Sequence, residues 1–112
     1  MEAEERQFLL TAAWIFARHG QRARARTLME AMCEANPRDG VSAAALAALM
    51  LSDGDGLGAL RALRTANFPS ELDRVEAILE TRALTALGRT AEGKRRWSRY
   101  LEARKGGARK WI

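Results

Sequence analysis

The residues of this chain that could do chemistry are mostly arginines and lysines. Three arginines alternate with small residues in GQRARAR, residues 20–26, and the whole chain carries a net charge of +5. Cationic side chains bind phosphate, so nucleic acid is one candidate ligand. At about 100° per residue, however, Arg22, Arg24 and Arg26 fan around a helix instead of forming one stripe. We therefore expect a solvated helix surface at this stretch.

A second and denser basic set lies near the C-terminus. It comprises Lys94, Arg95, Arg96, Arg99, Arg104, Lys105, Arg109 and Lys110. Basic residues interleaved with aromatic ones are typical of single-strand nucleic-acid platforms, where bases stack on the rings. The repeat register described below assigns Trp97 and Tyr100 to the core, which leaves only Trp111 for stacking. A nucleic-acid-binding module therefore remains an alternative and not the favoured function.

No residue pattern typical of an enzyme is present. One cysteine, Cys33, and one histidine, His19, cannot supply a set of zinc ligands, and GDG at 54–56 lacks the flanks of a phosphate-binding loop. We expect no catalytic residue, no metal and no cofactor. A single cysteine fits a reducing cytoplasm. The sequence contains no run of about 18 apolar residues, so we expect no direct membrane insertion.

The elements that carry these residues are expected to be helices throughout. Alanine, leucine, arginine and glutamate dominate the chain, whereas β-branched residues rarely alternate with polar ones. Glycine and proline divide it into six helices of modest length. The sequence therefore predicts the all-α class.

Glycine also recurs with a period, because Gly20, Gly54 and Gly88 follow one another at intervals of 34 residues. This interval is the period of the tetratricopeptide helix-turn-helix unit. Small residues come five positions after each glycine, where two helices would cross closely: Ala25, Ala59 and Gly93. Larger core residues are expected nine and twelve positions after it: Met29, Leu63 and Trp97, then Met32, Ala66 and Tyr100.

The period predicts three tetratricopeptide-like repeats that form a short right-handed solenoid. Their expected bounds are residues 6–39, 40–72 and 73–105. One domain then spans residues 1–105, and a basic tail spans residues 106–112.

In such a solenoid the first helix of each unit lines a concave surface, and here most of the expected lining is apolar. We assign partner binding to eight residues: Leu10, Trp14, Val41, Ala44, Ala48, Leu51, Val75 and Ile78. Apolar patches of this kind mark partner surfaces, and an amphipathic helix could dock with Trp14 as its anchor. Two alternatives stay open: tighter packing of the helices, or occupation of the groove by the chain's own C-terminal tail.

The first third of the chain resembles the first repeat of the SctY/YscY-type chaperones of bacterial type III secretion. The similar elements are Gln7-Phe8-Leu9-Leu10, Trp14, Gly20, Arg24-Ala25, Leu28 and Asn36-Pro37, and Tyr100-Leu101-Glu102 is similar to the family's final helix. The resemblance implies a small cytoplasmic chaperone with a role in protein transport and virulence. It would form a heterodimer with a secreted SctX-type protein and engage the cytoplasmic domain of the SctV-type export gate. The SctG-type chaperones of needle subunits share the architecture and are a rival family.

Overall fold

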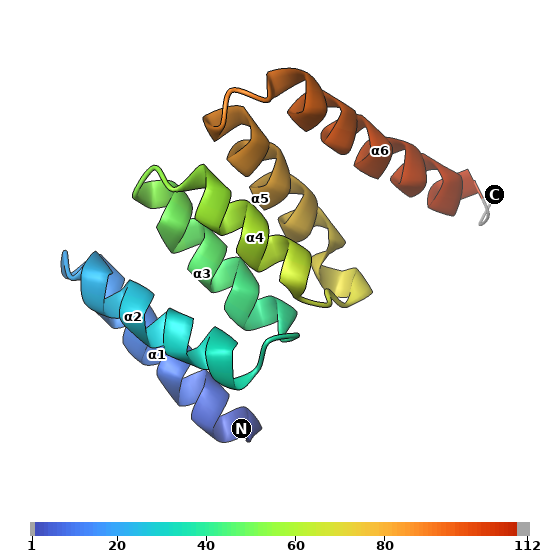
Figure 1. The fold of residues 1–112 in the computed structure, drawn as a ribbon. Helices are drawn as coiled ribbons and strands as arrows, with labels where there is room; N and C mark the ends of the chain where they lie inside the picture. The colour runs from blue at the N-terminus through green and yellow to red at the C-terminus, as the bar shows by residue number, and fades with distance from the viewer. Residues whose placement is uncertain (1, 110–112) are drawn as a thin grey trace.

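Residues 2–109 are described in the computed structural model of the protein, with side chains described through residue 106. Six α-helices make up most of this range (Figure 1). They are α1 (Ala3–Arg18), α2 (Arg22–Ala35), α3 (Gly40–Ser52), α4 (Gly56–Thr65), α5 (Asp73–Ala86) and α6 (Thr90–Arg109), with a short 3-10 turn, η1, at Ser70–Leu72. Within residues 2–109 there is no strand. The predicted all-α class and the prediction of six helices are therefore confirmed.

Consecutive helices pack against one another along the chain. Figure 1 shows three helical hairpins side by side, α1–α2, α3–α4 and α5–α6, with the two chain ends at opposite ends of the row. Between hairpins, α2 packs on α3, α4 packs on α5, and α3 also contacts α5 directly. The molecule is accordingly elongated, with principal extents of 43 × 33 × 23 Å.

The turn inside each hairpin has one repeated geometry. Gly20, Gly54 and Gly88 adopt φ angles of 75°, 79° and 78°, the left-handed region that only glycine enters without strain. The residue after each glycine donates its N–H to the carbonyl five positions back at 2.8 Å: Gln21 to Phe16, Asp55 to Met50, and Arg89 to Leu84. This is the Schellman ending of a helix, which satisfies carbonyls that the helix leaves free.

Small residues sit where the two helices of each hairpin cross, as the sequence predicts. Ala25 and Ala59 are completely buried. Gly93 is also buried, and a Cβ added to it would lie only 3.2 Å from the carbonyl oxygen of Thr81 on α5. Close approach of the helix backbones explains why larger side chains do not fit here.

The core consists of two clusters that meet on α3. The first contains Ala13, Ala25, Met29, Met32 and Leu46. The second contains Ala47, Ala59, Leu60, Leu63, Leu79, Ala83 and Leu84. Half-buried Met50 packs against both clusters. Burial of α3 between its neighbours accounts for its apolar sequence, since a helix that is hydrophobic all round belongs inside.

The expected burial of Ala66, Trp97 and Tyr100 is wrong, and Ala66 is half-buried at the end of α4. The side chains of Trp97 and Tyr100 are half-buried and stack on each other, with ring centroids 5.1 Å apart and planes inclined by 29°. The corresponding Met29 and Leu63 are buried because another hairpin packs beside them. Among residues 2–109 no further helix follows α6, so the same register there gives a partly exposed aromatic pair.

The last helix is longer than expected. It runs to Arg109, so the first four residues of the predicted tail, 106–109, continue α6. Trp111, which the sequence left as the one stacking candidate, lies outside the described residues.

Candidate binding groove

An apolar hollow with a volume of about 320 Å³ lies between α1 and α3. None of the residues that line it is charged: Leu10, Ala13, Trp14, Ala17, Met29, Ala45, Ala48, Leu49 and Ser52. We call this hollow the α1–α3 groove. Three of the predicted partner-binding residues, Leu10, Trp14 and Ala48, lie in it together.

Helical periodicity builds both walls of the groove. Leu10, Ala13, Trp14 and Ala17 follow the i, i+3, i+4, i+7 spacing that places side chains on one face of α1. On α3 the same spacing is followed by Ala45, Ala48, Leu49 and Ser52. The completely buried Met29 of α2 contributes to the floor.

Trp14 is the most prominent side chain of the groove. It is 60% exposed, although tryptophan is among the largest apolar side chains. The guanidinium of Arg18, one turn further along α1, lies 4.9 Å from the centre of its ring. This cation–π contact leaves part of the indole available to a ligand.

The other predicted groove residues lie elsewhere. Ala44 and Leu51 pack against the second core cluster, and Val41 is half-buried. Val75 and Ile78, on α5, are 38% and 37% exposed. α3 packs directly against α5, whereas α1 and α3 do not pack closely, and the hollow lies between these last two helices.

Sequence reasoning missed several groove residues. Ala13, Met29, Ala45, Leu49 and Ser52 were not among the eight assigned residues, and Ala17 was expected on the concave surface without an assigned role. The residues of α3 could have been found from their spacing. Ala45, Ala48, Leu49 and Ser52 follow one another at the same intervals as the α1 residues that line the groove.

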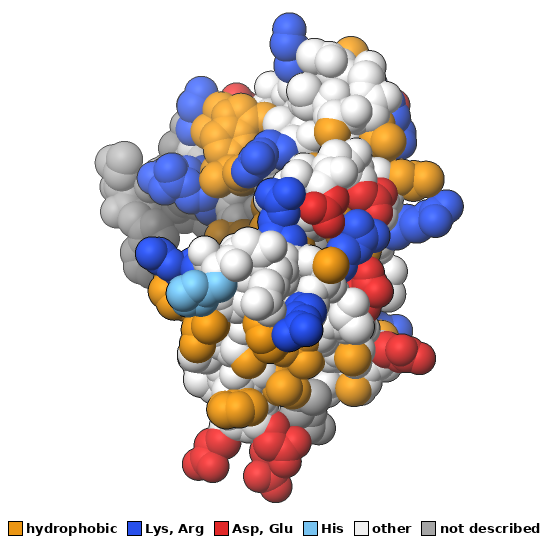
Figure 2. All heavy atoms as spheres, turned by 90° about the vertical axis from the view of Figure 1, so that its left-hand side faces the viewer, with side chains coloured by type: hydrophobic (Ala, Val, Ile, Leu, Met, Phe, Trp, Pro, Cys, Tyr) orange, Lys and Arg blue, Asp and Glu red, His pale blue; other side chains and the backbone are white. Residues whose placement is uncertain are grey.

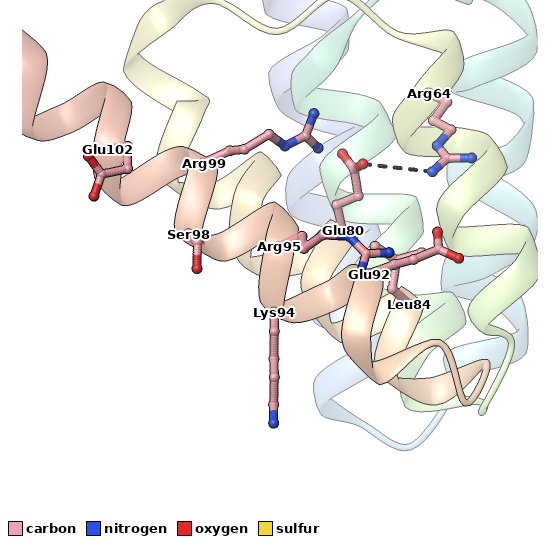
Figure 3. A pocket seen from close by; sticks show the side chains of 9 residues that line it. All are labelled: Arg64, Glu80, Leu84, Glu92, Lys94, Arg95, Ser98, Arg99 and Glu102. Atoms are coloured by element: carbon pink, nitrogen blue, oxygen red, sulfur yellow. Dashed lines mark ion pairs between the residues drawn. The ribbon is translucent and has the colours of Figure 1, made fainter.

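A larger cleft of about 810 Å³ lies beside α4, α5 and α6, and it is lined by charge of both signs (Figure 3). Its cations are Arg64, Lys94, Arg95 and Arg99, and its carboxylates are Glu80, Glu92 and Glu102. Three carboxylates among four cations disfavour phosphate, because they repel an anion at short range.

Glu80 of this cleft forms ion pairs with two arginines. Its carboxylate lies 3.3 Å from Nε of Arg96 and 4.0 Å from Nη2 of Arg64 (Figure 3 shows the second pair). The side chains of Glu80 and Arg96 are only 13% and 16% exposed. Arg96 of the C-terminal basic set therefore pairs with a carboxylate of α5 and is largely buried, unlike a solvated surface charge.

The arginines of residues 20–26 also differ in their environments. Arg26 is half-buried, and its guanidinium contacts Glu30 at 2.9 Å, Asp55 at 2.8 Å and Asp53 at 3.5 Å. Arg22 lies 3.5 Å from Asp53. Two of the three arginines thus connect α2 with the turn of the next hairpin. A purely solvated surface, as the sequence suggested, is therefore wrong for Arg26.

Asp55 is the centre of that ionic contact. It accepts a hydrogen bond of 2.8 Å from the N–H of Gly58 at the start of α4, and this bond, followed by the contact with Arg26, lowers the pKa of its carboxyl.

Cys33, on the same side of α2, is half-buried, and burial raises the pKa of its thiol to about 11. Its thiol is therefore largely protonated at neutral pH and a weak nucleophile.

Within residues 2–109, no three His, Cys, Asp or Glu side chains gather where they could hold a metal ion. The helices of this range include none with the length and hydropathy needed to cross a membrane. The chain matches no family model, and no curated protein sequence and no solved structure is significantly similar to it.

Proposed function

We propose that this protein is a tetratricopeptide-like adaptor that binds an apolar or amphipathic helix of a protein partner in the α1–α3 groove. The observation that carries the proposal is the groove itself, an uncharged hollow of about 320 Å³ beside a tryptophan that is 60% exposed. Apolar hollows with an aromatic anchor are where amphipathic helices dock.

The geometry of the walls favours a helix as the ligand. On both α1 and α3 the side chains that line the groove have a spacing of i, i+3, i+4, i+7. Ala45 and Ala48 are small, so the backbone of a docked helix could approach α3 closely. A ligand helix would pack against both α1 and α3, which make little contact with each other.

The resemblance to the SctY/YscY-type chaperones supplies the most specific version of the proposal. In it, the protein works in the cytoplasm and the partner is a secreted SctX-type protein, delivered to the SctV-type export gate. The rival version has a needle subunit in the same groove, as in the SctG-type chaperones. Both versions use the same chemistry, an apolar helix protected until export.

The experiment is co-expression of the chain with the SctX-type protein and, separately, with the needle subunit of the same host, followed by affinity capture. Trp14→Glu and Ala48→Arg should each reduce capture by about two orders of magnitude or more, because a docked helix would bury an unpaired charge. Capture of neither protein by the wild type would refute the specific versions. Equal capture by both groove variants would refute the groove.

Matched control variants separate binding from folding. Phe8→Glu, like Trp14→Glu, replaces an aromatic residue of α1 with glutamate. Phe8 lies outside the groove, and its side chain is 72% exposed. Ala103→Arg repeats the Ala48→Arg change at an exposed position of α6. Both controls should retain capture, and all four variants should keep the circular dichroism spectrum of a helical protein.

A further inference from the structure

A second apolar surface lies on the side of α1 that faces away from the core. Its residues, which we call the outer stripe, are Glu4, Phe8, Thr11, Ile15 and Arg18, and all of them are exposed. At 100° per residue, each lies within about 40° of the direction opposite to buried Ala13. Phe8 is 72% exposed and Ile15 is 46% exposed.

The outer stripe has the spacing of a helix–helix seam. Its members follow one another at intervals of four, three, four and three residues, the pattern by which two helices pack along their lengths. The middle of the stripe is apolar or small, with Phe8, Thr11 and Ile15. Its N-terminal end is acidic at Glu4, and its C-terminal end is basic at Arg18.

Other apolar side chains of the first hairpin are only partly covered. Figure 2, in which the left-hand side of Figure 1 faces the viewer, shows hydrophobic side chains gathered over the lower half of the view, acidic side chains at the lower tip, and most lysines and arginines above. Half-buried Leu9, Phe16 and Leu28 belong to this hairpin and pack against its core cluster. Outermost helices of stacked helical proteins ordinarily carry a polar face, so an apolar one marks a contact surface.

The charges at the two ends select the orientation of a partner helix. If α1 of another copy lay parallel, Glu4 would face Glu4 and Arg18 would face Arg18, and both contacts would repel. If it lay antiparallel and centred on Thr11, Glu4 of each copy would face Arg18 of the other. Phe8 would then face Ile15, so apolar side chains would meet apolar side chains. The outer stripe is thus complementary to itself.

We propose that the outer stripe of α1 is a self-association surface, on which α1 of a second copy packs antiparallel about a twofold axis near Thr11. Such an isologous contact uses the same patch on both copies and closes after two. Leu10 and Ala17 of the groove wall lie about 120° and 140° around α1 from the centre of the outer stripe, so the dimer leaves most of the groove open, whereas Trp14, which Arg18 contacts, borders the stripe. The inference does not depend on the proposed function.

Sedimentation of the full chain tests the dimer at concentrations up to about 1 mM. The wild type should show a reversible monomer–dimer equilibrium, and Phe8→Glu should raise the dissociation constant at least tenfold. Ala48→Arg, in the groove, should leave it unchanged. A wild type that stays monomeric, or larger oligomers, would overturn the proposal. Loss of the dimer in Ala48→Arg would place self-association in the groove and overturn it as well.

A charge exchange tests the antiparallel orientation without touching the apolar centre. Glu4→Arg alone, or Arg18→Glu alone, should weaken the dimer about tenfold, because each creates two like-charge contacts across the twofold axis. The double variant, Glu4→Arg with Arg18→Glu, should recover the wild-type affinity. An equal mixture of the two single variants should associate more strongly than either alone. Failure of both recoveries would exclude the proposed pairing, and helix content measured by circular dichroism controls for folding.

Discussion

The first and third hairpins share a backbone design and differ in what they expose. Both turn at a glycine, with φ angles of 75° and 78°, and both bury a small residue at the helix crossing, Ala25 or Gly93. The outward side of α1 nevertheless carries exposed Phe8 and Ile15, whereas α6 carries charged residues around a partly exposed aromatic pair. The same repeat register can therefore expose apolar side chains at one end of the molecule and charged side chains at the other.

The largest expected effect tests what the hairpins have in common. Ala25→Arg and Ala59→Arg should each destabilise the fold by several kcal/mol, about 3 or more, because a cation would enter a closed helix crossing without a partner. Thermal unfolding followed by circular dichroism measures the loss. Ala23→Arg, at an exposed position of the same helix, is the control and should melt close to the wild type. Similar melting of all three variants would refute the crossing as described.

The next effect separates the buried from the exposed charges of the third hairpin. Arg96→Gln should cost about 1–2 kcal/mol, because Glu80, 13% exposed, would keep only Arg64 at 4.0 Å. Arg95→Gln, at an exposed neighbour, should change the free energy of unfolding by less than about 0.5 kcal/mol. Urea titration of both variants measures the difference. If both variants had the same free energy of unfolding, Arg96 would not stabilise the third hairpin.

A smaller effect tests the turns, which have the same backbone but different side chains. Asp55→Ala should cost about 1 kcal/mol, because the start of α4 would lose its cap. The folded-state pKa of Asp55 is lowered, so its contribution is present above the unfolded-state pKa and is lost as the pH falls through the acid range. The variant should therefore lose less stability on acidification than the wild type does. An unchanged dependence on pH would contradict this assignment.

The smallest expected effect concerns nucleic acid. Arg95→Gln with Arg99→Gln should leave both folding and partner capture nearly unchanged, since both residues are exposed and the cleft beside them also holds three carboxylates. Binding to a fluorescent single-stranded oligonucleotide in a salt series is the measurement. Tight association that weakens steeply with salt, and that the double variant loses, would favour the nucleic-acid alternative.

The positions of the helices and turns along the chain could be predicted because their determinants are local. Glycine at 20, 54 and 88 marks the turns, and the second and third hairpins begin at Gly40 and Asp73, the positions that the period indicates. The burial of Trp97 could not be predicted in the same way, because burial depends on whether another helix packs beside it. Periodicity describes a residue's own hairpin and says little about its neighbours.

The groove was predicted only in part for the same reason. Leu10, Trp14 and Ala48 were found from their positions in the repeat, and they do share a hollow. Ala44 and Leu51 occupy equivalent positions but pack into the core, because α3 and α5 approach each other more closely than α1 and α3 do. Distances between hairpins depend on side-chain volumes across both partners, which a repeat pattern does not encode.

The three turns also bear on how the chain folds while it is being synthesised. Each turn closes through hydrogen bonds that span at most five residues, so a hairpin can form soon after its second helix leaves the ribosome. Met29, Met32 and Leu46 form one cluster, however, so the first hairpin cannot complete its core until α3 has been made. During that interval the nascent first hairpin presents apolar surface on two sides, and the one facing α3 is covered by the chain's own continuation.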